Sequence, residues 1–156
     1  MRRFKQQIPE AEARQIVAEA TNGVLSLIDP DGRPYGVPMS FVCDGEHTIY
    51  FHCAREGRKM DCIRHCSRAS FCIVALDDVQ PKEFTTYYRS VIVEGRIEVV
   101  ENRDEIIAAL RMLGQKYSPD IDSTREITDA LDRVAVLKLD IETLSGKEAI
   151  ELTRRR

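Results

Sequence analysis

The chain has 156 residues, of which 43% are hydrophobic and 31% are charged, a balance typical of a globular protein. Its formal net charge of −3 excludes the overall basic field that many nucleic-acid-binding proteins carry. The longest purely apolar run, residues 71–76, is too short to cross a bilayer, and no apolar stretch follows the basic N-terminus. We therefore expect a single cytoplasmic domain over residues 1–156 that binds neither nucleic acid nor membrane.

The first third of the chain predicts one helix followed by three strands. Residues 9–21 favour a helix because Pro9 stands at its start and small and apolar side chains recur on one face. The period then changes to two, and turns rich in Asp and Gly separate three short strands over residues 24–28, 35–43 and 48–53. Successive antiparallel strands of this kind form a meander.

The remaining elements mix helices and strands. We expect a short helix over residues 57–66, strands over 71–76 and 85–100 with a bend at Gly95, and a last strand over 134–141. Asn102 is placed to cap a helix that runs to Tyr117, and Ser123 with Glu126 forms a capping-box pattern for another helix. Residues 148–156 are predicted to be a C-terminal tail, frayed at its three arginines.

Six mostly antiparallel strands with helices between them predict a mainly β fold with inserted helices. A closed or nearly closed β-barrel is favoured because a flat sheet of short strands would leave two exposed edges. An open α+β sandwich is the alternative that periodicity leaves available.

The five cysteines are interpreted as packed, reduced thiols. Their number is odd and no C-x-x-C pair is present, which is unlike a disulfide framework. His52, Cys53, Cys62, His65 and Cys66 could supply a metal site, but only Cys62 and Cys66 have a ligand-like spacing. Four residues apart on a helix, these two cysteines would simply share a buried face, so we expect no metal.

The most informative cluster lies where the helix over residues 57–66 begins. Arg55, Arg58 and Lys59 are cations at a helix N-terminus, which carries partial positive charge and favours anions. A bound phosphate would remove this conflict, because free amides, the helix dipole and the basic side chains would converge on it. Gly57 would let the backbone approach the phosphate closely. The alternative is a solvated loop whose long side chains point into water.

His52 is the histidine best placed for chemistry, since it lies on a strand just before this cluster. Its imidazole could donate a proton or a hydrogen bond to a ligand, or it could be a structural histidine. The sequence contains no G-x-G-x-x-G, Walker, H-E-x-x-H or G-x-S-x-G motif, which removes the commonest nucleotide-binding, metalloprotease and hydrolase functions.

Four segments in order carry a resemblance to a known family. They are residues 36–41 (Gly-Val-Pro-Met-Ser-Phe), 50–52 (Tyr-Phe-His), 57–59 (Gly-Arg-Lys) and 88–95 (Tyr-Arg-Ser-Val-Ile-Val-Glu-Gly). Over residues 23–147 the chain resembles the pyridoxamine-phosphate-oxidase-like split barrels, closest to their nitroimidazole-resistance-related branch. That resemblance implies a homodimer of six-stranded antiparallel split barrels with FMN in clefts between the two subunits.

The resemblance also implies roles for individual residues. The backbone and small side chains of Val37, Pro38, Met39 and Ser40 would run beside the isoalloxazine ring, with Phe51 and His52 near the ring or the ribityl chain. Arg58 and Lys59 match the basic pair that holds the phosphate. Ser90 stands where the oxidases carry a glutamine, and Ser145-Gly146-Lys147 resembles a motif near the cofactor. The vitamin B6 oxidases themselves end in a tryptophan and an arginine-histidine segment, which this Trp-free chain lacks.

We therefore expect an FMN-dependent oxidoreductase that reduces a small electrophile, such as a nitro compound, with an unidentified electron donor. His52 is the candidate for positioning the substrate or supplying a proton. A flavin-binding module without turnover is the second hypothesis, and a related barrel that holds haem or a deazaflavin is the third.

Overall fold

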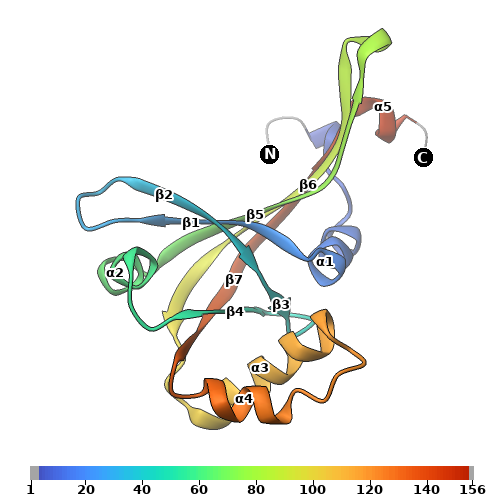
Figure 1. Cartoon of the computed structure of the whole chain (residues 1–156). Helices are drawn as coiled ribbons and strands as arrows, with labels where there is room; N and C mark the ends of the chain where they lie inside the picture. The colour runs from blue at the N-terminus through green and yellow to red at the C-terminus, as the bar shows by residue number, and fades with distance from the viewer. Residues whose placement is uncertain (1–3, 155–156) are drawn as a thin grey trace.

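One antiparallel sheet of seven strands organises residues 4–154, the part of the chain that the computed structural model describes (Figure 1). The strands are β1 (Asn22–Ile28), β2 (Pro34–Ser40), β3 (Val42–Cys43), β4 (Thr48–Ala54), β5 (Arg68–Gln80), β6 (Thr85–Val99) and β7 (Val134–Glu148). Their order in the sheet is β2-β1-β5-β6-β7-β4-β3. The helices are α1 (Glu10–Glu19), α2 (Arg58–His65), α3 (Arg103–Tyr117), α4 (Thr124–Ala130) and α5 (Ile150–Thr153), with 3-10 turns η1 (Phe4–Gln6) and η2 (Pro81–Glu83).

The predicted mainly β class is confirmed, but the sheet has seven strands instead of the predicted six, and it is open where a closed or nearly closed barrel was favoured. The run expected as one strand over residues 35–43 divides at Phe41 into β2, which pairs with β1, and β3, which pairs with β4. The hydrogen-bonded ladder is therefore open, and only the continuous chain through Phe41 joins its two ends. The expected meander is correspondingly interrupted within its second strand.

A tyrosine from α3 explains the break at Phe41. The Tyr117 hydroxyl accepts a hydrogen bond from the Phe41 amide at 2.9 Å and lies within donating distance of the carbonyl oxygens of Phe41 and Thr21. The hydroxyl accepts from the Phe41 amide, and its single proton can be shared between the two carbonyl oxygens, so the chain can leave the ladder there without an unpaired donor. Strand alternation alone could not predict a partner 76 residues away in the sequence.

The inner face of the sheet holds the main core. Phe41, Phe51 and Phe71 are fully buried, and Phe71 meets both other rings edge-on at centroid distances of 4.8 and 5.1 Å. Burial of each ring contributes about 1.5–3 kcal/mol from the hydrophobic effect, and the edge-on contacts add to it. A second apolar cluster lies outside the sheet, where α3 and α4 pack over β3, β4 and β7; it includes Val42, Val136, Ala109 and Ile127.

Gly95 produces the predicted bend in β6. The register with β7 shifts between Glu94 and Gly95, which marks a β-bulge. A Cβ atom at Gly95 would lie 1.8 Å from the carbonyl oxygen of Asp140. No other residue therefore fits at this position of β6 unless the backbone moves.

Strands β5 and β7 extend well beyond the predicted segments, whereas β6 matches its predicted span closely. The hairpin formed by β5 and β6 projects away from the rest of the molecule, with the two ends of the described chain near its base (Figure 1). At its tip Phe84 is 97% exposed and adopts a left-handed φ of 51°. Apart from Val79, residues 77–80 carry charged or polar side chains, and they gave no alternating pattern from which to predict a strand.

The predicted C-terminal tail carries structure as far as Thr153. Glu148 is the last residue of β7 and is only 1% exposed. Its carboxylate forms an ion pair with Arg89 at 2.9 Å. Residues 150–153 then form α5, and Arg154 is exposed. Arg155 and Arg156, for which fraying was predicted, lie outside the described residues.

The two predicted caps have different outcomes. The Asn102 side chain caps α3, accepting hydrogen bonds from the amides of Asp104 and Glu105 at 2.9 and 3.0 Å, as expected. The Ser123 capping box does not form, because no side-chain bond caps α4 and Asp122 instead accepts from the Thr124 amide. The carboxylate of Glu126 is thereby left free for another environment.

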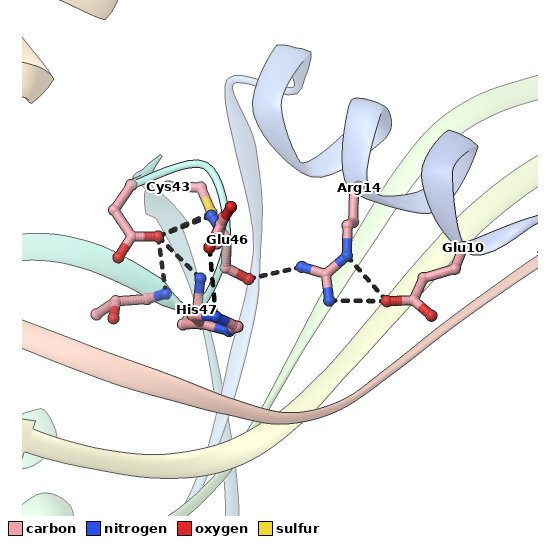
Figure 2. Close-up of polar contacts among 7 residues, drawn as sticks. Glu10, Arg14, Cys43, Glu46 and His47 are labelled. Atoms are coloured by element: carbon pink, nitrogen blue, oxygen red, sulfur yellow. Dashed lines mark hydrogen bonds and ion pairs between the residues drawn. The ribbon is translucent and has the colours of Figure 1, made fainter.

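Helix α1 is tied to the turn between β3 and β4 (Figure 2). Arg14 pairs with Glu10 and donates to the carbonyl oxygen of Glu46 at 2.6 Å. In the turn, the Asp44 carboxylate accepts from the amides of Glu46, His47 and Thr48. Over residues 4–154 no helix is long and apolar enough to cross a membrane.

Candidate functional site

The outer face of β2 exposes two of the four residues assigned to the cofactor ring. Pro38 and Ser40 point outward, whereas Val37 and Met39 turn toward the core, with Met39 only 8% exposed. This alternation follows from the period of two along a strand. Val37 and Met39 could therefore contact an outer-face ligand only through their backbone.

The next strand separates the neighbours Phe51 and His52 in the same way. Phe51 is fully buried in the core, so its ring cannot reach a ligand outside the sheet. His52 is exposed on the outer face of β4. The orientation that the sequence left open is thus resolved toward the side where Pro38 and Ser40 also lie.

His52 and Ser40 line a cavity of about 360 Å³ between the sheet and the helices α3 and α4. Its other lining residues come mainly from the two helices: Leu110, Leu113, Gly114, Tyr117, Ser123, Glu126, Ile127, Ala130 and, from β7, Val134. The walls are largely apolar, with a few polar groups at the rim. This volume lies within the range of small-molecule sites, which are also mostly apolar with few polar groups.

The start of α2 has the free amides that a phosphate site requires. No side chain caps this helix, and its first backbone hydrogen bond runs from the Asp61 amide to the Gly57 carbonyl. The amides of residues 58–60 therefore have no partner within the helix. Gly57 has a φ of 119°, and a Cβ there would meet nothing within 4 Å, so its backbone conformation and not crowding requires glycine.

The three cations of this cluster have three different environments. Arg58 pairs with Asp29 at 3.0 Å and stacks over the Tyr35 ring at 4.3 Å. Arg55 turns away, donating to the carbonyl oxygens of Leu131 and Val134. Among the described residues Lys59 has no ion pair within 4 Å, so it is the cation most available to a ligand.

Asp29 is a buried carboxylate that the sequence analysis missed. It is 6% exposed and accepts from the amides of Asp31 and Arg33 as well as from Arg58. The Arg33 amide, together with Arg58 and the Asp31 amide, keeps the pKa of Asp29 below its ordinary value despite burial. Asp29 and Tyr35 hold the Arg58 guanidinium at the start of α2. An Asp-Pro-Asp-Gly turn gave no signal of this contact, since the partner is 29 residues away.

Ser90 is remote from the cavity within one chain. The register places Pro38, Val24, Cys72 and Ile92 in one row across four strands, so Pro38 and Ile92 are three strand spacings, about 14 Å, apart. Ser90 lies two residues beyond Ile92 and pairs with Val74 and Lys147. The structure therefore brings together Ser40 and His52, and leaves Ser90 on a different part of the sheet.

Comparison with known proteins defines the family. The family model described as pyridoxamine 5'-phosphate oxidase matches residues 9–148. The chain belongs to the pyridoxamine 5'-phosphate oxidase family. The resemblance drawn from the four segments is thereby confirmed, and no curated protein matches this family member.

Three solved structures show the same fold at low identity. A protein of Bacteroides thetaiotaomicron with a proposed role in 5-nitroimidazole antibiotic resistance has 23% identity and a TM-score of 0.78, over 91% of this chain and 86% of its own. An FAD- and haem-binding protein of Mycobacterium smegmatis has 22% identity and a TM-score of 0.76, covering 93% and 73%. An FAD-binding protein of Mesorhizobium loti has 21% identity and a TM-score of 0.64, covering 92% and 97%.

In this family member the Ser145-Gly146-Lys147 segment has a packing role. A Cβ at Gly146 would come within 2.3 Å of Ile8, whose amide donates to the Gly146 carbonyl. Lys147 lies over the Tyr88 ring at 5.4 Å. The segment thus fastens the N-terminal residues to β7.

The cysteines do not converge with other ligands. Among residues 4–154 no three His, Cys, Asp or Glu side chains are grouped so as to hold a metal ion. Cys62 is buried in the main core, and burial raises the pKa of its thiol. Cys53 lies 3.8 Å from the sulfur of Met60. These contacts are those of thiols packed in or beside a core.

Proposed function

We propose that this family member binds FMN on the outer face of β2 and β4 and acts as an oxidoreductase on a small electrophile, such as a nitro compound. The observation that carries the proposal is the uncapped, glycine-led start of α2, with Lys59 available, four residues after the end of β4, the strand that exposes His52. The FAD-binding relatives support a flavin in this fold.

Each residue would contribute through the position described above. The amides of residues 58–60, with Lys59 and the Asp29-held Arg58, would bind the phosphate. The exposed backbone and small side chains of Pro38 and Ser40 would leave room for a flat ring. When bound, a flavin supplies the transfer of a hydride to an electrophile. The His52 imidazole would hold or donate the proton that the reduced product needs.

A homodimer follows from the same proposal. Within one chain, Ser90 lies too far from Ser40 and His52 to contact the same ring, so a second copy would have to supply it. The strands between them expose the apolar side chains of Val24, Val74 and Ile92 to 42%, 64% and 43%. An apolar surface of this kind is typical of an interface, and two-fold symmetry is the commonest way to bury it.

Cofactor binding is tested with the purified protein and a matched pair of lysine variants. We expect a flavin spectrum that bleaches with a dihydronicotinamide as hydride donor. Lys59→Ala should weaken FMN about tenfold, since it removes one charge-assisted phosphate contact, and should leave riboflavin binding unchanged. Lys82→Ala, at the hairpin tip, is the control. Equal losses for FMN and riboflavin would mean that Lys59 supports the fold and not the phosphate site.

The same titration separates FMN from FAD and from haem. The Mycobacterium smegmatis relative binds FAD and haem, so a protein that retains FAD more tightly, or that shows a Soret band, would overturn the FMN assignment. A flavin that binds but is reoxidised no faster by any nitro compound than by buffer would favour the second candidate function, a flavin-binding module without turnover.

His52→Gln tests the catalytic part. We expect the variant to keep its flavin and to slow reoxidation by a nitro compound about a hundredfold, the usual contribution of a general acid. His65→Gln, an exposed histidine at the end of α2, is the matched control. Unchanged stopped-flow rates in a fully loaded His52→Gln protein would show that His52 takes no part in proton transfer.

A further inference from the structure

The cavity beneath α3 and α4 has a chemical character that restricts what can bind in it. Leu110 and Leu113 of α3 and Ile127 of α4 form its walls, opposite His52 and Ser40 on the sheet. Gly114 allows α4 to approach, because a Cβ there would lie 2.8 Å from the Ser123 hydroxyl oxygen. The cavity is therefore a largely apolar space with the sheet on one side and the two helices on the other.

The charges around this space are unbalanced. Glu126 is the one lining residue with a permanent charge, and it is available because the predicted capping box does not form. Among residues 4–154, no lysine or arginine lines the cavity. Arg55 lies near Val134, but its guanidinium donates hydrogen bonds to the carbonyl oxygens of Leu131 and Val134. An anionic ligand would meet a carboxylate and no cation, which costs free energy in a largely apolar site.

We infer that this cavity is the substrate pocket, and that it accepts uncharged, largely apolar ring compounds and rejects phosphorylated or carboxylated ones. The inference deepens the proposed function and rests on it, because the proposed function is what places a flavin beside this cavity. The sheet contributes Ser40, His52 and Val134 to the lining, and of these Ser40 and His52 can donate a hydrogen bond to a polar substituent of such a ring. The ring itself would contact the leucines and Ile127.

Two fluorinated probes test the charge preference by ¹⁹F NMR line broadening. They are 3-fluoronitrobenzene, which is neutral, and 3-fluoro-5-nitrobenzoate, which adds one carboxylate to the same ring. We expect the neutral probe to bind at least about tenfold more tightly, because the carboxylate must be desolvated beside Glu126. Equal affinities, or tighter binding of the benzoate, would overturn the inference.

Glu126→Lys should reverse this preference. Replacing the carboxylate with an ammonium group should strengthen benzoate binding about tenfold and leave the neutral probe within about twofold. Asp129→Lys makes the same change of charge on the same helix outside the cavity, and should alter neither affinity. An equal gain for both variants would show a general effect of protein charge and would contradict a specific pocket.

Ala130→Phe places a ring inside the cavity, and Ala108→Phe places the same ring on the exposed side of α3. Only the first should weaken the neutral probe, by about tenfold or more. Equal effects of the two variants would overturn the inference. Should Ala130→Phe fail to fold, the Glu126→Lys and Asp129→Lys pair decides the question.

The probes are titrated into apoprotein and into flavin-loaded protein, so that the two proposals can fail separately. A chain that binds the neutral probe in this cavity but binds no flavin would refute the proposed function and leave the pocket in place. Loss of flavin from folded Ala130→Phe would show that the cavity holds the cofactor ring and would refute the substrate assignment.

Discussion

The two halves of the outer sheet face differ in what covers them. Over β3, β4 and β7, the helices α3 and α4 bury Val42 to 8% and Val136 to 0% exposure. Over β1, β5 and β6, Val24, Val74 and Ile92 remain exposed to between 42% and 64%. Both halves carry apolar side chains at alternate positions, so alternation shows which side chains share a face and not what packs against it. One half is completed by this chain, and we propose that a second copy completes the other.

The largest effect should separate the inner face from this uncovered outer one. Phe71→Ala removes a fully buried ring in contact with Phe41 and Phe51, and should lower the free energy of unfolding by about 3–5 kcal/mol. Ile92 directly precedes Val93, the cross-strand partner of Phe71, and so lies on the opposite face; Ile92→Ala should cost less than about 1 kcal/mol in the monomer. Urea denaturation at low protein concentration measures both, and comparable losses would contradict the distinction between the faces.

The proposed interface can be broken with one charge on the uncovered half. Ile92→Asp should weaken self-association about a hundredfold, because it desolvates a carboxylate within an apolar contact. Ile121→Asp, which changes an isoleucine that is 65% exposed in the loop before α4, should leave association unchanged. Sedimentation velocity over a range of concentrations compares the variants. A wild-type chain that remains monomeric throughout would refute the dimer.

Tyr117→Phe tests the connection at Phe41, where the chain passes from β2 to β3. Tyr117→Phe leaves the Phe41 amide and carbonyl without the hydroxyl that satisfies them. We expect a loss of about 1–3 kcal/mol in unfolding free energy, the cost of unpaired buried polar groups. Amide hydrogen exchange should accelerate at Phe41 and not in β6. Uniformly faster amide exchange across the sheet would mean that the tyrosine supports the whole fold and not the connection at Phe41 alone.

The smallest expected effect concerns the turn that ties α1 to β3 and β4. Burial would raise the pKa of Asp44, but hydrogen bonds from the amides of Thr48, Glu46 and His47 outweigh it and lower the pKa. A lowered folded pKa stabilises the protein above the unfolded value of about 3.9, and this stabilisation is lost as the pH falls through the folded value. Stability should therefore fall below about pH 4, and less steeply in Asp44→Asn than in the exposed control Asp120→Asn. Identical slopes would contradict this role.

Local signals were reliable where the determining contacts are close in the sequence. Asn102 was predicted as a cap because the amides it satisfies are two and three residues away. Gly95 was predicted as a bend because a glycine within a strand marks a bulge, and the start of α2 was recognised from cations that conflict with the helix dipole. The four family segments carried the identification for the same reason, since each is short and contiguous.

What the sequence by itself determined is most of the elements, their faces and the family; what the tertiary structure decided is which residues meet. Alternation divides Phe51 from His52 in any strand, but only the packed molecule shows that His52 opens into a cavity with Leu113 and Glu126. The break at Phe41 and the Asp29–Arg58 pair likewise depend on partners 76 and 29 residues away. Such contacts arise from how helices and turns pack on the sheet. A hydrophobic period of two or 3.6 residues cannot predict them, because it describes only one element at a time.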